Sequence, residues 1–367
     1  MGFLEDILTY AVKNGASDVH LTVGSPPAVR IDGIIRFLRG EALSPSDTVG
    51  FLEEILNPQQ KERYLNSGDF DLAYSISGLG RFRVNILRQR GSVGIVMRHV
   101  RSKILDFASL HLPEVAMETI CQMRRGLILV TGTTGSGKST TLASVIDRIN
   151  EQQRLHVVTV EDPIEYLHVN KKSIITQREI GLDTMDFRVA LRAVMREDPD
   201  VILIGEMRDP ETFAAAMAAS ETGHLVFSTL HTTNAMMSVD RIIDLFPSNQ
   251  HDQIRSQLSL QLRGLVAQRL LPTADGKGRV PAIEVMFNSP AIAALIRENN
   301  VKQIPTAIAA GKEEGMQTFN MSLLGLIREN LITEEEAMWA SDNPEVLKGN
   351  LQGFSFQSDR GGILKKR

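Results

Sequence analysis

The chain has 367 residues, which is enough for two or three domains that each bury a core of their own. A net charge of -4 at pH 7 provides no overall attraction to nucleic acid or anionic lipid. The single cysteine, Cys121, excludes an internal disulfide and a cysteine-rich zinc site. The acidic, amphipathic N-terminal segment differs from a signal peptide, and no apolar run approaches the ~20 residues that span a bilayer. We therefore expect a cytoplasmic protein.

The first hundred residues predict a small α+β domain. The amphipathic residues 3–14 predict a helix. Strand-like segments interrupted by glycine and proline follow, and their alternation of apolar and polar residues favours a mainly antiparallel sheet. These segments are residues 18–23, 27–38, 70–76 and 80–100. Residues 101–113 are predicted to form a linker.

The pattern changes at residue 114, where helices begin to alternate with continuous apolar runs. This alternation indicates a parallel sheet with crossover helices on both faces. The apolar runs are residues 126–132, 155–161, 199–206 and 224–230. After Gln268 the strands are expected to give way to helices. We therefore predict an α/β domain at residues 114–270, a helical subdomain at residues 271–350 and a flexible tail at residues 351–367.

The strongest functional signal is "GTTGSGKST", which satisfies the phosphate-binding pattern G-x-x-x-x-G-K-[ST] between a strand and a helix. Backbone N–H groups of such a loop curl around phosphate oxygens, and the N-terminus of the following helix adds positive potential. Lys138 is expected to contact the β- and γ-phosphates of ATP, and the Ser139 hydroxyl to bind Mg²⁺. The predicted nucleotide-binding residues of this loop are Gly132, Thr133, Thr134, Gly135, Ser136, Gly137, Lys138, Ser139 and Thr140.

Carboxylates follow two of the predicted strands. In "VVTVEDPIEY" the strand runs into Glu161, Asp162 and Glu165. In "DVILIGEMRD" Gly205 stands where an aspartate commonly holds the metal, and Glu206 follows it. Carboxylates at the carboxyl ends of parallel strands face the ligand crevice, so the two groups are expected to share one site.

The roles of these acids allow two assignments. In the first, Glu206 acts mainly on the metal through water, and Glu165 orients the attacking water. Glu161 and Asp162 then have a supporting, orienting role. In the competing assignment, Glu206 is the base because it directly follows the position of the missing aspartate. A non-catalytic alternative is an Asp-Pro turn with solvated carboxylates.

Two histidines flank the last apolar run. His224 precedes it and His231 follows it, and a residue at such a strand end can sense the γ-phosphate. The alternative for either is a hydrogen-bonded core histidine. Upstream, Asp209 and Pro210 predict the N-cap and the first position of a helix.

Arginines recur in the segment "GRFRVNILRQR". By the two-residue period of a strand, Arg81 and Arg83 share one face, and Arg88 and Arg90 share one face. Such arginines can clamp a nucleotide from another domain or a neighbouring subunit. The alternatives are a solvated strand face and a nucleic-acid contact, and the second is weaker without interleaved aromatics on a basic domain.

Four further segments make the chain similar to a known family. They are "GASDVHLTVGSPPAVRIDG", "VEDPIEY", "LIGEMRDPET" and "TGHLVFSTLHT". Together they resemble the secretion ATPase superfamily (the GspE/PilT family) over nearly the whole chain, and within it the PilT-like retraction motors of bacterial type IV pili. The resemblance implies a PAS-like α+β domain at residues 1–100, a RecA-like P-loop ATPase core at residues 114–270 and a homo-hexameric ring.

The same resemblance implies roles for individual residues. By motif match, Lys138 and Ser139 correspond to the Walker A pair, and Glu165 to the catalytic glutamate of the aspartate box. Glu206 corresponds to the atypical Walker B acid, and His224 and His231 to the histidine-box pair. The resemblance also makes Arg81, Arg83 and Arg88 nucleotide-facing arginines.

The branch within the superfamily is indicated by two features. Extension motors and type II secretion ATPases typically carry a tetracysteine zinc insertion, which a chain with one cysteine cannot form. The retraction branch carries a C-terminal motif written A-I-R-N-L-I-R-E. The matching segment is "AIAALIRE", in which Ala293 and Ala294 replace Arg and Asn. The matched positions are Ala291, Ile292, Leu295, Ile296, Arg297 and Glu298. A plain amphipathic core helix is the alternative, and the choice between a principal and an accessory retraction motor stays open.

We therefore expect a hexameric Mg-ATPase that depolymerises type IV pili. It would dock from the cytoplasm on an inner-membrane platform protein, alone or with a paralogous retraction or extension ATPase, without nucleic acid and without structural zinc. One alternative is a motor for another cargo, such as a pseudopilus or a conjugative channel. Others are a regulatory subunit that binds nucleotide but hydrolyses little, and a DNA translocase, which the net negative charge disfavours.

Overall fold

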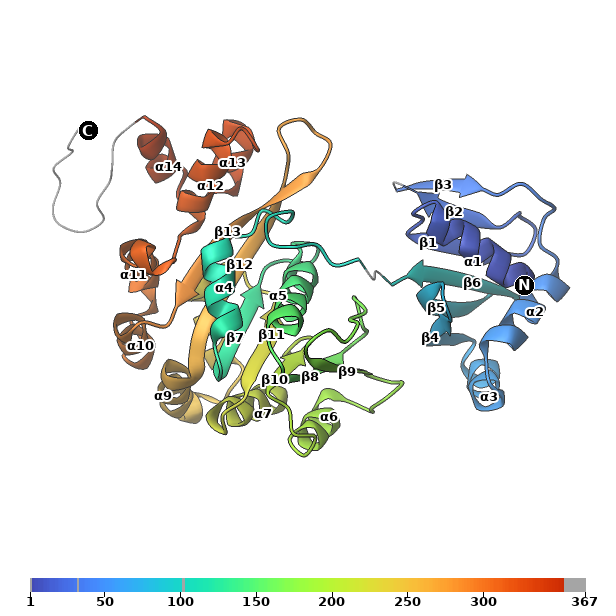
Figure 1. The fold of residues 1–367 in the computed structure, drawn as a ribbon, viewed down its shortest axis with the longest axis horizontal. Coiled ribbons are helices and arrows are strands. Elements are labelled where there is room, and N and C mark those ends of the chain that lie inside the picture. Colours follow the sequence, from blue (N-terminus) through green and yellow to red (C-terminus); the bar gives the residue numbers. More distant parts are fainter. Residues whose placement is uncertain (1, 32, 101–102, 353–367) are drawn as a thin grey trace. The chain divides into compact units, whose positions relative to one another are not determined.

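The computed structural model describes residues 2–31, 33–100 and 103–352. The chain divides into two compact units, Met1–Ser102 and Lys103–Arg367 (Figure 1). Each unit has a hydrophobic core of its own. Among the helices that the structure describes, none is both long and apolar enough to cross a bilayer.

The N-terminal unit contains a six-stranded antiparallel sheet in the order β3-β2-β1-β6-β5-β4. The prediction of a mainly antiparallel sheet is therefore confirmed. Its strands are β1 (Asp18–Thr22), β2 (Ala28–Ile31), β3 (Ile34–Phe37), β4 (Asp69–Ile76), β5 (Gly80–Gln89) and β6 (Ser92–His99). Its helices are α1 (Phe3–Lys13), α2 (Pro45–Ile55) and α3 (Pro58–Ser67).

The arginine-bearing segment forms β5, but the strand ends sooner than predicted. Arg81 and Arg83 lie on the face of β5 opposite its buried core side chains. Arg88 lies on the core side, with its guanidinium 6.0 Å from the centre of the Tyr64 ring. Arg90 has a φ of 51° in the turn between β5 and β6. The prediction that Arg90 shares a strand face with Arg88 is therefore wrong, because the hairpin turn needs that residue in a left-handed conformation.

The C-terminal unit contains a seven-stranded sheet in the order β13-β12-β7-β11-β10-β8-β9. All neighbouring strands are parallel except β12 and β13, which are antiparallel. The strands are β7 (Gly126–Thr131), β8 (His156–Glu161), β9 (Ile174–Glu179), β10 (Val201–Ile204), β11 (Leu225–Leu230), β12 (Leu262–Pro272) and β13 (Arg279–Phe287). The four predicted apolar runs form β7, β8, β10 and β11, so the predicted parallel α/β sheet is confirmed.

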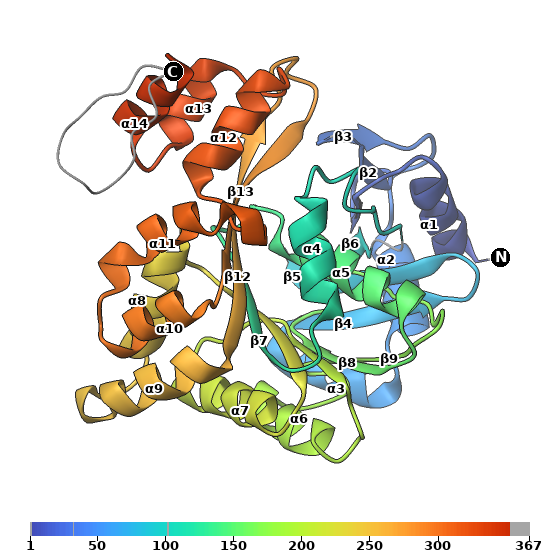
Figure 2. The same ribbon diagram turned by 60° about the vertical axis from the view of Figure 1, so that its left-hand side comes forward.

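Helices cover both faces of this sheet. Figure 2 shows α4 and α5 on one side and α7 and α9 on the other. Helix α4 (Glu114–Gln122) precedes the first strand of the sheet. The helices between its strands are α5 (Lys138–Gln152), α6 (Phe187–Val194), α7 (Pro210–Glu221), α8 (Ala235–Asp244) and α9 (His251–Gln261). As predicted, Asp209 caps α7, its side chain accepting a hydrogen bond from the backbone of Thr212, and Pro210 begins the helix.

The expectation that strands end near Gln268 is wrong. β12 continues to Pro272 and pairs with β13 in a long hairpin, so the segment predicted as a helical subdomain contributes a strand to the sheet. Pro281 within the apolar run of β13 hid the strand in the sequence, but β13 lies at the sheet edge, where proline is tolerated. The helices that follow are α10 (Pro290–Arg297), α11 (Ile304–Ala310), α12 (Phe319–Arg328), α13 (Glu334–Ala340) and α14 (Pro344–Leu351).

Two predicted connecting segments lie partly outside the described residues. The predicted tail begins at Leu351, which is the last residue of α14. Residues 353–367 of this tail are outside the described part of the chain. Of the predicted linker, residues 101 and 102 are outside it as well.

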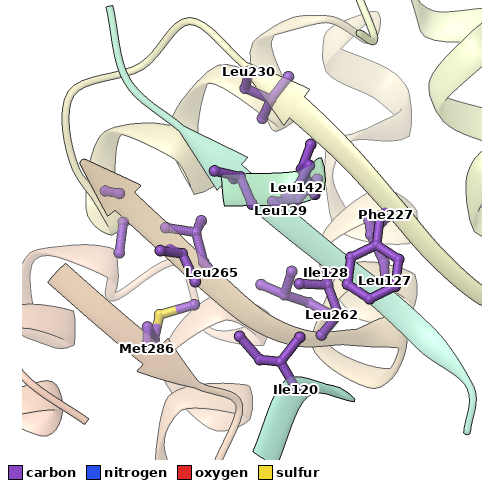
Figure 3. Close-up of a cluster of buried hydrophobic side chains, with 14 of the residues drawn as sticks. Ile120, Leu127, Ile128, Leu129, Leu142, Phe227, Leu230, Leu262, Leu265 and Met286 are labelled. Atoms are coloured by element: carbon purple, nitrogen blue, oxygen red, sulfur yellow. The ribbon is translucent and has the colours of Figure 1, made fainter. Parts of the chain in front are cut away.

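Strand β7 lies deep within the C-terminal unit, and all of its residues are buried. Figure 3 shows its side chains packed among those of the neighbouring strands and helices. The labelled side chains are Ile120, Leu127, Ile128, Leu129, Leu142, Phe227, Leu230, Leu262, Leu265 and Met286. Burial of each large apolar side chain contributes roughly 1.5–3 kcal/mol relative to exposure. The loop that follows β7 therefore begins from a firmly held strand.

Candidate nucleotide-binding site

The glycine-rich segment forms a tight loop between β7 and α5. Gly132, Gly135 and Gly137 have φ angles of 149°, 79° and 94°, which side-chain-bearing residues rarely adopt. A Cβ atom at Gly132 would also lie 2.4 Å from the Oγ atom of Ser136. Position 132 thus requires glycine both for its backbone conformation and for lack of space for a side chain.

The chemistry of this loop fits a nucleotide phosphate. The Ser136 hydroxyl is buried and has no hydrogen-bond partner within the described part of the chain. The N-terminus of α5 has no side-chain cap, which leaves its first N–H groups for an anion. The exposed members of the loop and first turn are Thr133, Thr134, Gly135 and Ser139. The Ser139 hydroxyl is therefore accessible to the Mg²⁺ that we expect to accompany the phosphates.

Lys138 is buried within the loop, with 8% of its surface exposed. Its Nζ atom donates hydrogen bonds to the carbonyl oxygens of Gly132 at 2.8 Å and Thr133 at 3.0 Å. Burial lowers the pKa of Lys138, and the nearby Glu206 carboxylate acts in the opposite direction. The ammonium group thus lies within the curve of the loop and within electrostatic range of the Glu206 carboxylate.

The segment after β8 is held against α5 by side-chain contacts. The hydroxyl groups of Tyr166 and Thr140 lie 2.8 Å apart. Glu161 accepts hydrogen bonds from Thr159 Oγ1 at 2.7 Å and from the Glu165 backbone N–H at 3.4 Å. Burial raises the pKa of Glu161, and these hydrogen bonds oppose that effect. Glu161 therefore positions the turn that carries Glu165.

Asp162 and Glu165 lie on this turn and are exposed. Asp162 precedes a cis peptide bond to Pro163. The exposure of Glu165 leaves its carboxylate accessible to a ligand, as the predicted water-orienting role requires.

The glycine at position 205 is explained by the close approach of two strand ends. The Gly205 N–H donates to the Val160 carbonyl at 2.8 Å, and Thr229 Oγ1 donates to the Gly205 carbonyl at 2.7 Å. A Cβ atom at position 205 would lie 3.3 Å from the Cα atom of Glu161. An aspartate in this position would crowd that backbone, and the acid is instead supplied by the next residue, Glu206.

We expect Gly205→Ala to destabilise the C-terminal unit by about 1–3 kcal/mol, because the added methyl group forces the two strand ends apart. Urea denaturation measures this change. Gly278→Ala is a matched control, because its Cβ atom would be no closer than 3.8 Å to the Thr273 side chain. A stability of Gly205→Ala equal to that of the control would contradict this explanation of Gly205.

Glu206 lies just after β10 with 15% of its side chain exposed. One carboxylate oxygen lies 2.6 Å from the Arg208 guanidinium, and the other lies 3.6 Å from Nε2 of His231. Glu206, His231 and Lys138 are therefore gathered at the carboxyl end of the sheet. The sequence predicted a role at the bound nucleotide for each of these three residues.

His224 lies at the opposite end of β11 from His231. The parallel pairing places Leu225 beside Gly126, where β7 begins, and Leu230 beside Thr131, where the phosphate loop follows. The Nδ1 atom of His224 lies 3.0 Å from the Ala219 carbonyl at the end of α7. The structure therefore does not bring His224 to the phosphate loop. The side chain is half-buried and hydrogen-bonded to the end of α7, so it fits the alternative of a hydrogen-bonded histidine, although not one in the core.

Arg81, Arg83 and Arg88 belong to the N-terminal unit. Their assignment as nucleotide-facing residues stays a prediction. Sequence reasoning missed Gln268, a buried residue of β12 that hydrogen-bonds to the phosphate loop. The available signal was a pair of adjacent polar residues, Gln268 and Arg269, within the apolar run "GLVAQRLL".

The predicted C-terminal motif forms α10, capped by the Ser289 side chain. Ile292 and Ile296 are buried, as the amphipathic pattern predicts. Ala293, Ala294 and Leu295 are half-buried, and Ala291, Arg297 and Glu298 are exposed. The motif therefore has a structural face in the core and polar residues at its exposed C-terminal end.

A second buried carboxylate lies on β13. Glu284 accepts a hydrogen bond from the Ala235 backbone N–H at 2.7 Å, at the start of α8. Burial raises the pKa of Glu284 to about 7, and the negative charge of Asp342 acts in the same direction. The hydrogen bond from Ala235 and the positive charge of Arg269 act against this increase. Because this pKa exceeds the ordinary value of 4.5, the folded state holds a proton that the unfolded state has released between these two pH values.

The contribution of Glu284 to stability is thus fully present below pH 4.5 and is lost as the pH rises through about 7. Glu284→Gln keeps an oxygen for the Ala235 N–H and stays neutral. We expect this variant to match the wild type near pH 4 and to be about 2–3 kcal/mol more stable at pH 8. Urea unfolding at both pH values measures the difference, and equal stability at pH 8 would contradict it.

Comparisons with known proteins show the family to which the chain belongs. The family model described as "Type II/IV secretion system protein" matches residues 1–337. A Pseudomonas aeruginosa protein named "Type IV pilus retractation ATPase PilT" is 43% identical over 342 residues, which cover 93% of this chain and 99% of that protein. A second P. aeruginosa protein, "Type IV pilus ATPase PilU", is 41% identical over 344 residues, which cover 94% of this chain and 90% of that protein.

A solved structure described as "Crystal Structure of the Pilus Retraction Motor PilT and Bound ADP" matches with a TM-score of 0.86 at 48% identity, covering 95% of this chain and 99% of that one. The Legionella pneumophila ATPase DotB matches with a TM-score of 0.74 at 26% identity, covering 92% and 94%. The predicted resemblance and fold class are confirmed, and the chain belongs to the Type II/IV secretion system protein family.

Proposed function

We propose that this chain is a Mg²⁺-dependent ATPase that powers the retraction of type IV pili. The observation that carries the proposal is the complete phosphate loop with Lys138 buried in its curve and Glu206 beside it. Similarity to proteins named as pilus retraction motors supplies the biological setting.

The residues of the site suit the steps of phosphoryl transfer. The loop N–H groups and Lys138 would bind the phosphates, and Ser139 would hold Mg²⁺, with Glu206 acting through water. When bound, Mg²⁺ neutralises charge on the β- and γ-phosphate oxygens. Glu165 would orient the attacking water, and Glu161 holds its backbone in place. In the competing assignment Glu206 is the base, and His231 lies close enough to affect its charge.

The proposed assembly is a homo-hexamer that docks from the cytoplasm on an inner-membrane platform protein. Arg81, Arg83 and Arg88 are further proposed nucleotide-binding residues, by the motif resemblance. A paralogous retraction or extension ATPase is a further proposed partner. An accessory role is the second candidate, because two relatives named PilT and PilU are almost equally similar and Ala293 and Ala294 depart from the retraction motif.

A count of surface pili tests this proposal in a strain that lacks the gene, with and without a Lys138→Ala copy. Abundant pili and lost twitching in both strains would support an ATP-dependent retraction motor. Absent pili would instead indicate extension or assembly. Normal piliation and motility would favour an accessory paralogue or a motor for another cargo.

A further inference from the structure

Gln268 lies on β12, the strand beside β7, and only 2% of its surface is exposed. Its side-chain amide bridges two parts of the phosphate-binding segment. Nε2 donates to the Ser136 carbonyl oxygen at 2.6 Å, and Oε1 accepts from Thr141 Oγ1 at 2.9 Å. A single side chain thus joins the loop to the first turns of α5.

The loop packs directly against Gln268, without intervening side chains. A Cβ atom at Gly137 would lie 2.9 Å from Nε2 of Gln268, and one at Gly132 would lie 2.5 Å from its backbone carbonyl oxygen. Contact with Gln268 is therefore one reason why these two positions of the loop must be glycine. A displacement of Gln268 would therefore also shift the loop backbone, because the two are in direct contact.

The hydrogen bond from Gln268 to the Ser136 carbonyl fixes the orientation of a whole peptide group. The Ser136 carbonyl belongs to the same planar peptide group as the Gly137 N–H, and this peptide bond is trans. In a trans peptide the C=O and N–H point in opposite directions, so Gln268 turns the Gly137 N–H away from itself. That N–H makes no hydrogen bond within the described part of the chain.

We propose that Gln268 is a positioning residue for the bound nucleotide, because it fixes the Ser136–Gly137 peptide so that the Gly137 N–H faces a phosphate. This inference rests on the proposed function. The amide suits the task because Ser136 presents an acceptor and Thr141 a donor, and only a group with both properties satisfies the two at once. A glutamate could not donate to the Ser136 carbonyl, and an apolar side chain would leave both groups unpaired.

Gln268→Met is the direct test, because methionine has a similar volume and makes neither hydrogen bond. We expect it to weaken the binding of ATP by about 10- to 100-fold, as for buried polar groups left unpaired, and to raise KM more than it lowers kcat. Thr141→Val is the matched control, since it removes only the hydrogen bond to Oε1 and leaves the one to Ser136. Its affinity for ATP should fall by less than about 5-fold.

The readouts are the Kd for ATP by calorimetry, the kcat and KM of hydrolysis, and the Tm without nucleotide, which reports any general loss of packing. If Gln268→Met fails to fold, Gln268→Glu, which keeps the acceptor but not the donor, takes its place with the same expected loss. A Kd within twofold of the wild type in the folded variant overturns the inference while the proposed function stands. A loss as large in Thr141→Val would also overturn it, because the Ser136 contact would then not be the one that matters. Wild-type protein that binds no ATP overturns the proposed function itself.

Discussion

ATP hydrolysis is expected to fall by about 10²–10³-fold or more when Lys138 is replaced by alanine. The reason is electrostatic: Lys138 supplies the ammonium group within the curve of the phosphate loop, where negative charge gathers during phosphoryl transfer. The replacement also removes hydrogen bonds to the carbonyls of Gly132 and Thr133, so the loop itself should loosen. Steady-state release of phosphate by the purified protein measures the rate, and calorimetry measures nucleotide affinity separately.

Lys171→Ala is a suitable control for this prediction. Lys171 forms ion pairs with Asp147 and Glu151 on the exposed side of α5, and such surface pairs contribute little to stability. The control should hydrolyse ATP at nearly the wild-type rate. A Lys138→Ala protein that retained a tenth or more of the wild-type activity would contradict the role given to this lysine.

The second large effect is expected for Glu165→Gln, whose rate of hydrolysis should fall by about 10²–10⁴-fold. The substitution keeps the shape of the side chain and removes the carboxylate that would orient the attacking water. Nucleotide affinity should change little, because the loop and Lys138 are untouched. Glu206→Gln should differ in kind: it should raise the concentration of Mg²⁺ needed for half-maximal rate.

The two variants together decide between the assignments of the base. A near-normal rate in Glu165→Gln, with a rate in Glu206→Gln that no amount of Mg²⁺ restores, would transfer the role of base to Glu206. The position of Glu206 between Arg208 and His231 leaves that chemistry open to it. Glu211→Gln serves as the control, since Glu211 is an exposed residue paired with Arg188.

The parts of the site that could be predicted from the sequence are those set by local pattern. Continuous apolar runs predicted β7, β8, β10 and β11, because strands covered on both faces need apolar residues at every position. The phosphate loop was predictable because its glycines and its lysine lie within nine consecutive residues. The Gly205 position was recognised as unusual, but its reason needed the structure, since it depends on the distance to Glu161.

What the sequence did not reveal depends on contacts between distant residues. Gln268 is far from the phosphate loop along the chain, and only the pairing of β12 with β7 brings the two together. The hairpin partner β13 was missed because a proline interrupts its pattern and an edge strand does not need a crossover helix. His224 and His231 appeared equivalent in the sequence because both flank a strand, whereas the two ends of a strand face different surroundings.

The most direct test of the proposed motor is the retraction of labelled pili in living cells, recorded over time. The strain should lack this gene and any paralogous retraction ATPase, so that only the introduced copy can act. We expect the wild-type copy to restore retraction and the Lys138→Ala copy to leave pili extended. Retraction at the wild-type frequency with the Lys138→Ala copy, or none with the wild-type copy, would contradict it.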